Sequence, residues 1–494
     1  MICVSIGRTR HKMVVAEHRA LADQGAELVE LRLDWLSRVP DLNRLLAEKP
    51  TPVVLTCRRR SDKGRWSGSE DQRQTVLRSA IVCQADYVDL EDDIAKAIPR
   101  YGETRRIISH HNFDETPDDL EEIHKRMCDL DPDIVKLVTM ANRPEDSVRL
   151  LKLVAGSEVP TVGFCMGELG LASRLLCGKY GAPFTYATFS SERALAPGQL
   201  SYEEMAKVFR YDRIGSQTRV FGVLGDPVGH SHSPLIHNAA FDADGLDAVY
   251  LPLRVPADRL QQTLDAFEWL EIDGYSVTIP HKEAVLEFAT NRDASVERLG
   301  AANTLCRTAG SDWSASNTDL PAAIDALQTT LGSDRASGSL KGRKCLVLGA
   351  GGAARAIAGG LIDEEAAVTV SGRTRSRANE LATELGCQEI GWENRGTQFT
   401  DVLINCTPVG MHPEINETPF QPQWLDEGTL VFDTVYNPEN TLLLKQARQR
   451  GCPTVSGVEM FVRQAARQYD QFTNRPAPLG VMREALRHGI SAVR

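Results

Sequence analysis

The chain of 494 residues lacks several features that would each define a class of protein. No apolar run approaches the roughly 18 residues that a membrane helix needs. The eleven cysteines are scattered singly and include no C-x-x-C pair, so a disulfide framework is not indicated. The histidines and cysteines also lack metal-ligand spacing, and we expect no metal. These absences exclude membrane-spanning proteins, disulfide-stapled domains and zinc modules.

Positive charge is also scarce. Lys and Arg total 56 against 67 Asp and Glu, which gives a net charge of −11. The long-range field repels polyanions, so we expect small-molecule substrates rather than nucleic acid or membrane partners. Hydrophobic residues at 42% and charged residues at 25% are typical of a globular chain, and the length allows about three domains. Because the cysteines read as reduced thiols and a strand is predicted directly after Met1, the cytoplasm is the expected location.

Short β-rich runs alternate with helical patterns between Ile2 and Ala187. Eight such repeats predict a compact (β/α)8 barrel, and a doubly wound sheet is the alternative. The predicted strands are Ile2–Ile6, Leu28–Leu33, Pro52–Cys57, Tyr87–Leu90, Arg106–Ser109, Ile134–Val138, Thr161–Cys165 and Phe184–Ala187.

A polar stretch around Gly215 predicts a domain boundary. The elements predicted beyond it are strands at Arg219–Leu224, Ala248–Leu253, Gly274–Ile279, Lys344–Gly349, Ala367–Ser371, Val402–Asn405 and Leu430–Asp433, with helices at Lys282–Phe288 and Gln464–Phe472 among others. We therefore expect an N-terminal (β/α)8 barrel over residues 1–212, fused to a two-domain α/β unit. Its parts are a small α/β domain over 219–331 and a Rossmann-type dinucleotide-binding domain over 332–457.

Charged side chains interrupt the predicted barrel strands. Glu30, Arg32 and Asp34 alternate along one strand, so they would share a face near the C-terminal mouth, where such barrels place active sites. A structural ion-pair ladder is the alternative. Lys136 lies in an apolar strand, where burial would favour a neutral amine able to attack a carbonyl; the alternative is a paired structural charge. His111, at a strand end, is either a proton shuttle or a surface or capping histidine.

Cations gather after another predicted strand. Arg58-Arg59-Arg60, with Lys63 and Arg65, forms the densest positive patch of this half. Most charge runs are solvated faces, but this one lies where a carboxylated substrate would enter. Arg174 and the turn Ala196–Gln199 add a guanidinium and a polar loop near the last two strands.

The first half resembles the type I 3-dehydroquinate dehydratase family. The matching segments, in family order, are Glu30–Asp34, Thr56–Arg58, Ser109–Phe113, Ile134–Leu137, Gly170–Arg174 and Ala196–Gln199. The resemblance implies that Lys136 forms an imine with the substrate ketone. It also implies that His111 removes the neighbouring proton and later protonates the departing hydroxyl. The substrate-binding residues that it implies are Glu30, Arg32, Arg58, Arg174 and Gln199.

Three positions depart from this family's pattern. Asp62 stands where Glu is usual, Asn112 replaces an Asp after the histidine, and Leu195 replaces a Ser before the Ala-Pro-Gly-Gln turn. The family uses that Glu and Ser to orient the histidine and contact the substrate. We therefore expect the departures to bear on turnover and affinity more than on the reaction class.

A Gly-rich turn in the second half predicts a nucleotide site. Gly349, Gly351, Gly352 and Ala353 follow a strand and open an Ala-rich helix, which suits a pyrophosphate; a plain Gly-rich turn is the alternative. The next strand runs into Arg373-Thr374-Arg375, without the carboxylate that usually binds the ribose hydroxyls of NAD. These cations suit a 2′-phosphate and favour NADP.

Other polar residues precede predicted helices. Ser231 and Ser233 offer hydroxyls for a polyol or carboxylate, although serines there commonly cap helices. Lys282 follows a strand and a proline, and Asp319 precedes a helix. Separately they could be a surface charge and an N-cap. Paired across a cleft, they could relay the proton that accompanies hydride transfer to a ketone.

The second half resembles the shikimate dehydrogenase family over about residues 219–485. The matching segments are Gly225–Pro234, Val277–Lys282, Gly300–Thr304, Asn317–Asp319, the Gly-rich turn, Asn405–Met411 and Gly457–Phe461. The resemblance implies that Lys282 and Asp319 are the catalytic pair, that residues 219–331 bind substrate and that the C-terminal helix (458–494) packs back on them. The substrate-binding residues that it implies are Ser231, Ser233, Thr278, Asn303 and Gln464. Ser276, Gly372 and Ala322 depart from common family residues, and we expect them to tune cofactor affinity.

Overall the chain resembles plant-type fusions of these two families. The fusion implies dehydration of 3-dehydroquinate followed by NADPH reduction of 3-dehydroshikimate to shikimate. Two alternatives are a non-catalytic sensor of such metabolites and a catabolic quinate or shikimate dehydrogenase that uses NAD. Retention of Lys136, His111, Lys282 and Asp319 disfavours the sensor, and the Arg373–Arg375 segment disfavours NAD.

Overall fold

The computed structural model describes residues 1–47, 49–193, 195–308, 312–334 and 338–490. By its internal contacts the chain divides into two units, one formed by Met1–Pro234 with Asp247–Ile272 and the other by Leu235–Leu246 with Asp273–Arg494. None of the described helices is both long and apolar enough to cross a lipid bilayer.

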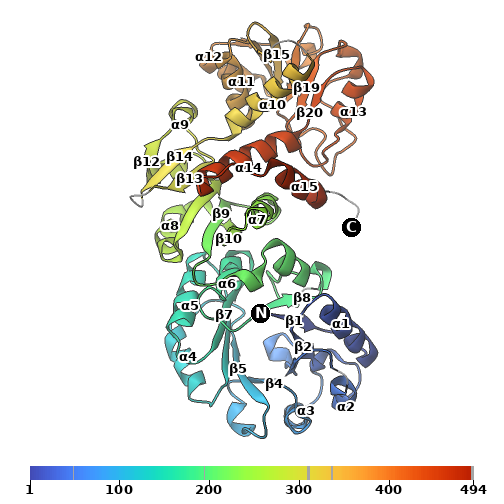
Figure 1. Cartoon of the computed structure of the whole chain (residues 1–494), viewed down its shortest axis with the longest axis vertical. Helices are drawn as coiled ribbons and strands as arrows, with labels where there is room; N and C mark the ends of the chain where they lie inside the picture. Colours follow the sequence, from blue (N-terminus) through green and yellow to red (C-terminus); the bar gives the residue numbers. More distant parts are fainter. Residues whose placement is uncertain (48, 194, 309–311, 335–337, 491–494) are drawn as a thin grey trace. The chain divides into compact units, whose positions relative to one another are not determined.

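The first unit contains the predicted barrel, which is confirmed. Its eight parallel strands follow the order β7-β6-β5-β4-β3-β2-β1-β8, with helices around the outside (Figure 1). The strands are β1 (Ile2–Ile6), β2 (Leu28–Arg32), β3 (Val53–Thr56), β4 (Tyr87–Glu91), β5 (Arg105–His111), β6 (Ile134–Met140), β7 (Thr161–Met166) and β8 (Thr185–Thr188). The helices are α1 (His11–Asp23), α2 (Leu42–Leu46), α3 (Glu70–Val82), α4 (Leu120–Cys128), α5 (Glu145–Gly156) and α6 (Leu171–Leu176). Parallel strands are covered on both faces, which explains their near-continuous apolar sequences.

Inside the barrel, the side chains change character along six of the strands, β1 to β6. Residues at one level are apolar, and those two positions further along, on the same face of the strand, are polar. The pairs are Cys3 and Ser5, Leu28 and Glu30, Val54 and Thr56, Tyr87 and Asp89, Ile107 and Ser109, and Ile134 and Lys136. The polar members form a connected set of hydrogen bonds and ion pairs. The barrel therefore has an apolar floor and a charged layer toward the C-terminal ends of its strands.

The expectation that Asp34 continues the alternation of Glu30 and Arg32 along one strand is wrong. β2 ends at Arg32, and Asp34 lies in a 3-10 turn, Leu33–Trp35. The buried Asp34 carboxylate accepts hydrogen bonds from the backbone N of Arg58 at 3.2 Å and of Arg65 at 2.9 Å. The chain leaves the strand at this point because the carboxylate gathers donors from the loop after β3.

The first unit also contains β9 (Arg219–Gly225) and β10 (Ala248–Arg254), which pair in parallel, and α8 (Leu260–Phe267). In the second unit, β11 (Ile272–Val277), β13 (Thr304–Arg307) and β14 (Trp313–Ser316) pair antiparallel in that order, and β12 (Ala289–Arg292) runs parallel to β14. The helices of this stretch are α7 (Ser233–Ala243), α9 (Ala294–Leu299) and α10 (Asp319–Asp334). The helix expected over Lys282–Phe288 is a shorter 3-10 helix, Ala284–Phe288.

The predicted Rossmann-type sheet is also present. Its six parallel strands follow the order β17-β16-β15-β18-β19-β20. They are β15 (Lys344–Leu348), β16 (Ala367–Ser371), β17 (Gln388–Glu389), β18 (Val402–Asn405), β19 (Leu430–Asp433) and β20 (Thr454–Val455). The helices are α11 (Gly352–Asp363), α12 (Arg375–Leu385), α13 (Leu442–Gln449), α14 (Gly457–Thr473) and α15 (Leu479–Ile490). Alternate residues of β15 enter two separate apolar cores, Cys345 and Val347 one and Leu346 and Leu348 the other.

Helix α14 contacts the antiparallel strands of the second unit through Gln468. This buried side chain accepts a hydrogen bond from Ser276 at 2.7 Å and donates to the carbonyl of Asn303 at 3.0 Å and to Thr304 at 3.2 Å. A fully satisfied buried amide fixes the position of the helix against β11 and β13.

Two candidate active sites

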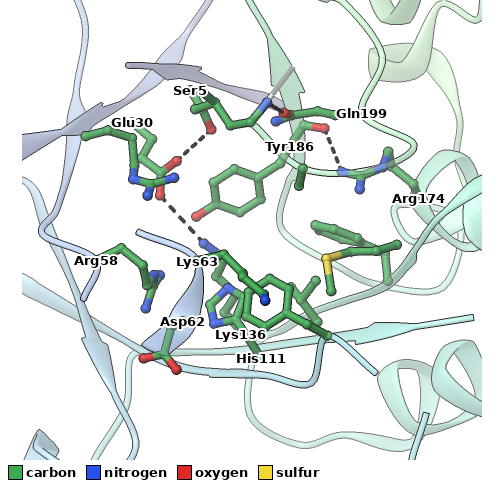
Figure 2. A pocket seen from close by; sticks show the side chains of 17 residues that line it. Ser5, Glu30, Arg58, Asp62, Lys63, His111, Lys136, Arg174, Tyr186 and Gln199 are labelled. Carbon is green, nitrogen blue, oxygen red and sulfur yellow. Dashed lines mark hydrogen bonds and ion pairs between the residues drawn. The ribbon is translucent and has the colours of Figure 1, made fainter. Parts of the chain in front are cut away.

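A pocket of about 580 Å³, partly open to solvent, lies at the C-terminal end of the barrel strands. The seven barrel residues predicted as catalytic or substrate-binding all line it: Glu30, Arg32, Arg58, His111, Lys136, Arg174 and Gln199. Figure 2 labels six of them, Glu30, Arg58, His111, Lys136, Arg174 and Gln199, and shows their side chains converging from different strands and loops. Of the three residues that depart from the family pattern, Asp62 and Leu195 line the pocket and Asn112 does not.

Lys136 sits at the centre of this charged layer. Its ammonium is 3.0 Å from the Asp89 carboxylate and 3.6 Å from Glu30, and its side chain is only 6% exposed. Burial acts to raise the pKa of Glu30, but the nearby cations Lys136 and Arg32 outweigh it and lower the pKa. The ammonium is therefore held between two ionised carboxylates, as in the paired-charge alternative, and it also faces the pocket.

Arg58 is engaged by carboxylates rather than free at the entrance. Its guanidinium donates to Asp89 at 2.8 Å and to Glu91 at 2.9 Å, and the residue is 4% exposed. Glu91 also accepts from the fully buried Arg73 at 2.7 Å. Burial would raise the pKa of Asp89, but the cations Arg58 and Lys136 lower it far below its usual range. Alternating buried charges thus run from α3 to Lys136.

Two further members of the predicted positive patch are also engaged within the protein. Arg59 donates to Asp62 and to Asp93, and Arg65 stacks 3.4 Å above the ring of Trp35. Lys63 lines the pocket. The patch is therefore less available to a substrate anion than the sequence indicates.

Arg174 differs from the other buried pocket cations. It is 2% exposed and lies 4.1 Å above the Phe164 ring, and one nitrogen donates to the Tyr186 carbonyl at 3.2 Å. Its Nε has no hydrogen-bond partner in the described residues, and none of the ion pairs found there includes it. Burial without a carboxylate lowers its pKa to about 10. An uncompensated buried guanidinium facing a pocket is suited to receive a carboxylate from a ligand.

His111 ends β5 and stacks on Phe113, with ring centroids 5.8 Å apart. Burial, together with the cations Arg58 and Lys136, lowers its pKa well below the usual value, while Asp89 acts in the opposite direction. The imidazole is therefore neutral at pH 7 and able to accept a proton. Asn112 accepts hydrogen bonds from the backbone of two following residues, so it shapes the turn after β5.

The loop that carries Gln199 is closely fitted to the loop after β7. The side-chain amide oxygen Oε1 of Gln199 accepts a hydrogen bond from the backbone N of Leu195 at 2.8 Å. Gly198 has a φ of +70°, and a Cβ there would come within 2.7 Å of the Gly167 carbonyl oxygen. Only glycine fits this conformation and this separation.

Sequence reasoning missed five residues that shape the pocket: Arg73, Asp89, Glu91, Ser109 and Tyr186. Two of them carried a usable signal. Asp89 follows the inward-facing Tyr87 at the same spacing at which Lys136 follows Ile134. Tyr186 lies two residues after Phe184 on an expected strand, so the two aromatic rings share a face. The position of Tyr186 next to Lys136, however, depends on the strand register.

The second candidate site centres on Lys282 and Asp319, which are paired as predicted. Their side chains form a hydrogen bond of 2.6 Å and remain 33% and 22% exposed. Asn303 is buried, and its side-chain oxygen accepts a hydrogen bond at 2.8 Å from the backbone N of Thr318, the residue before Asp319. Thr278 is half-buried at the end of β11.

The remaining predicted substrate residues have local partners. Gln464 of α14 donates to the carbonyl of Phe461 at 3.0 Å. Ser231 and Ser233 belong to the first unit, where the Ser231 hydroxyl accepts from the backbone N of Ser233 at 3.3 Å. This contact at the start of α7 is of the kind that the helix-cap alternative describes.

The residues present fit a dinucleotide. Gly349 has a φ of +118°, and a Cβ there would lie 3.0 Å from the Cys406 carbonyl oxygen, so glycine is needed for the turn. At Gly351 and Gly352 a Cβ would meet nothing within 4 Å, so the start of α11 faces open space that a pyrophosphate can enter. Ala353 is exposed there, and Arg373-Thr374-Arg375 is exposed after β16.

Comparison with known families agrees with this geometry. A family model for type I 3-dehydroquinase matches residues 2–216. Models for the shikimate dehydrogenase substrate binding domain, for shikimate / quinate 5-dehydrogenase and for the shikimate 5′-dehydrogenase C-terminal domain match residues 223–305, 331–407 and 457–487.

Individual relatives cover the whole chain or its second half. The chain is 37% identical over 500 residues to the chloroplastic bifunctional 3-dehydroquinate dehydratase/shikimate dehydrogenase of Arabidopsis thaliana, covering 97% of this chain and 83% of the relative. It is 39% identical over 284 residues to the shikimate dehydrogenase (NADP(+)) of Methanosarcina mazei, covering 56% and 99%. A crystal structure of a shikimate dehydrogenase with NADP+ superposes with a TM-score of 0.52 at 33% identity, covering 56% of this chain and 97% of that one.

Fold and sites together define a class of protein in which a lysine-centred (β/α)8 barrel is joined to a dinucleotide-binding α/β unit. The full-length match makes the assignment specific. The chain belongs to the bifunctional 3-dehydroquinate dehydratase/shikimate dehydrogenase family.

Proposed function

We propose that the barrel dehydrates 3-dehydroquinate to 3-dehydroshikimate and that the second site reduces this ketone to shikimate with NADPH. Family membership supports both activities. The observation that carries the dehydratase assignment is the placement of Lys136 and Arg174 in one pocket. The first is an amine positioned for a ketone, and the second is a buried guanidinium suited to the carboxylate of the same substrate.

In the barrel, the reaction begins when the Lys136 ammonium gives one proton to a neighbouring carboxylate and the resulting neutral amine adds to the substrate ketone. A C–N bond forms, the carbonyl oxygen leaves as water, and the positive charge remains on the iminium nitrogen. Arg174 holds the substrate carboxylate, with Gln199, Glu30, Arg32 and Arg58 as the other proposed substrate-binding residues. The Glu30 and Arg58 side chains also fix the charges around the lysine.

His111 supplies the acid–base chemistry. As a neutral imidazole it removes the proton next to the iminium, whose charge acidifies that C–H bond. As an imidazolium it then returns the proton to the departing hydroxyl, which leaves as water. Hydrolysis of the iminium releases the ketone product and restores the lysine, so the substrate has lost one water overall.

At the second site, NADPH supplies the hydride when it is bound. We assign its pyrophosphate to Gly349, Gly351, Gly352 and Ala353, and its 2′-phosphate to Arg373, Thr374 and Arg375. Lys282, hydrogen-bonded to Asp319, donates the proton to the ketone oxygen and is then reprotonated through that pair. The proposed substrate residues are Ser231, Ser233, Thr278, Asn303 and Gln464.

The organisation proposed for this chain remains a dehydratase barrel (1–212), a substrate-binding domain (219–331) with the C-terminal helix (458–494) packed on it, and an NADP-binding domain (332–457). The contacts of Gln468 in α14 with β11 and β13 support the helix placement. We keep the cytoplasm as the proposed location, since the eleven cysteines, all within the described residues, form no disulfide and suit a reducing compartment.

The test is an NADPH-oxidation assay started with 3-dehydroquinate and no added enzyme. Progress requires both sites, so sustained oxidation is the expected result. Oxidation with 3-dehydroshikimate alone would mean that the barrel is inactive, and no response to either compound would favour a sensor. Rates with NADH that equal those with NADPH would contradict the role of Arg373 and Arg375.

A further inference from the structure

Two buried cations of the barrel pocket each rest on an aromatic ring. The Lys136 ammonium is 4.0 Å from the centroid of Tyr186, and the Arg174 guanidinium is 4.1 Å from that of Phe164. The two rings are adjacent, with centroids 6.2 Å apart. Tyr186 is 4% exposed and lines the pocket in which Figure 2 shows its ring beside the lysine. Cation–π attraction is strongest at such desolvated sites.

The chemistry of the lysine makes this ring contact more important as the reaction proceeds. The ammonium has three N–H bonds and contacts Asp89 at 3.0 Å and Glu30 at 3.6 Å. When R–NH3⁺ and a ketone condense to R–NH⁺=C and water, the nitrogen keeps its charge but only one N–H. It can then donate to one carboxylate at a time. A ring face needs no N–H to attract a cation, so its stabilisation persists in the iminium.

We propose that Tyr186 is a positioning residue whose ring stabilises the cationic nitrogen of Lys136 before and after it condenses with the ketone. This inference rests on the proposed dehydratase function. The ring is held in place by edge contact with Phe184, at a centroid separation of 5.6 Å. It therefore presents its face to the lysine.

The tyrosine hydroxyl is not needed for this role. Among the described residues its oxygen has no hydrogen bond to a nitrogen or oxygen atom, and the polar group that it interacts with is the weakly polar thiol of Cys3. Tyr186→Phe keeps the ring and removes the hydroxyl, whereas Tyr186→Leu removes the ring and keeps an apolar side chain. The two variants separate the ring from its hydroxyl, and circular dichroism with urea denaturation of each variant reports on its folding.

The measurement is the rate at which sodium borohydride with 3-dehydroquinate traps the imine on Lys136, followed by mass mapping, together with dehydratase kcat and KM. For Tyr186→Leu we expect trapping and kcat to fall by roughly 10- to 30-fold, the range of a desolvated cation–π contact. KM should change much less. Tyr186→Phe should stay within about 3-fold of the unmodified protein, since at most a weak contact between the hydroxyl and the Cys3 thiol is lost.

A graded series removes any dependence on how Tyr186→Leu folds. Phenylalanine and its 4-fluoro, 3,5-difluoro and pentafluoro analogues at position 186 keep the ring shape while the negative charge of its face declines. The trapping rate should decline in that order. A flat series, an unaffected Tyr186→Leu, or equal losses in Tyr186→Phe and Tyr186→Leu would overturn the inference. No trapping in the unmodified protein would instead overturn the proposed dehydratase itself.

Discussion

The two lysines proposed for catalysis occupy opposite environments. Lys136 is 6% exposed between the buried carboxylates of Glu30 and Asp89, on an aromatic ring. Lys282 is 33% exposed and pairs with Asp319, itself 22% exposed. The difference follows the proposed chemistry. Covalent catalysis needs a dry, preformed arrangement of charges, whereas a pair that completes its surroundings with a cofactor and a substrate can stay open to water beforehand.

Replacement of Lys136 tests its buried environment most directly. In Lys136→Met we expect dehydratase kcat to fall at least ~10⁴-fold, the scale of losing a nucleophile. Dehydrogenase activity on added 3-dehydroshikimate should remain. Because the carboxylates of Glu30 and Asp89 lose their buried partner, the free energy of unfolding should also fall by about 3–5 kcal/mol. Steady-state assays of both activities and urea denaturation test this prediction. Dehydratase activity that persists in the variant would contradict an imine mechanism on Lys136.

The reciprocal change is Lys282→Met. Dehydrogenase kcat should fall by ~10²–10⁴-fold, as expected for loss of a general acid, and dehydratase activity should stay unchanged. The free energy of unfolding should change by less than about 1 kcal/mol because the pair is partly exposed. Lys136→Met is the matched control for both assays. A loss of stability equal to that of Lys136→Met would contradict the difference in environment.

Arg174→Met separates binding from stability within the barrel. Dehydratase kcat/KM should fall by ~10- to 100-fold because a charge-assisted contact to the substrate carboxylate is lost. The melting temperature should hold or rise, since a buried cation without a carboxylate is replaced by an apolar side chain. Kinetics and thermal unfolding of the same preparation check both parts. Destabilisation by several kcal/mol with normal kcat/KM would assign Arg174 a structural role instead.

The smallest effect contrasts two buried carboxylates. Asp89 lies between cations, whereas the donors to Asp433 are the neutral groups of Asn405, Thr441 and Val435. Burial, only partly offset by these donors, raises the pKa of Asp433 to about 6. Its native form therefore keeps a proton that the unfolded chain has lost, and its contribution to stability falls as the pH rises from about 4 to 6.

Asp433→Asn should remove this dependence. The unfolding free energy of the variant minus that of the unmodified protein should rise by about 1–3 kcal/mol between pH 4 and pH 7. Urea denaturation at the two pH values, followed by a probe in the dinucleotide-binding sheet, measures the difference. A difference that does not vary with pH would place the pKa of Asp433 near its usual range.

Much of the fold was readable from the sequence because parallel strands buried on both faces leave continuous apolar runs. Lys136 stood out for the same reason, as a charge within such a run. Its partner Asp89 is likewise a charge within a strand, but only the register of β4, β5 and β6 shows that the two side chains meet. Asp34 was misplaced because its donors come from a loop that follows a different strand.

Charge composition was harder to interpret than hydrophobic pattern. Arg58 looked like part of an exposed cationic run, yet it is saturated by carboxylates that lie 31 and 33 residues further along the chain. Among the described residues, Arg174 is the buried arginine of the pocket that has no acidic partner. Nothing in the sequence around Arg174 indicates this. Whether a charge is available to a ligand depends on long-range pairing, which motif spacing does not encode.

The tight seating of Gly198 on Gly167 offers a way to shut one activity without touching its chemistry. A methyl group at position 198 would come within 2.7 Å of the Gly167 carbonyl oxygen, so the loop that carries Gln199 or the loop that carries Gly167 would have to move. Gly198→Ala replaces one hydrogen by a methyl group and leaves every charged group of the pocket unchanged. This substitution is therefore a route to a chain that performs only the reduction.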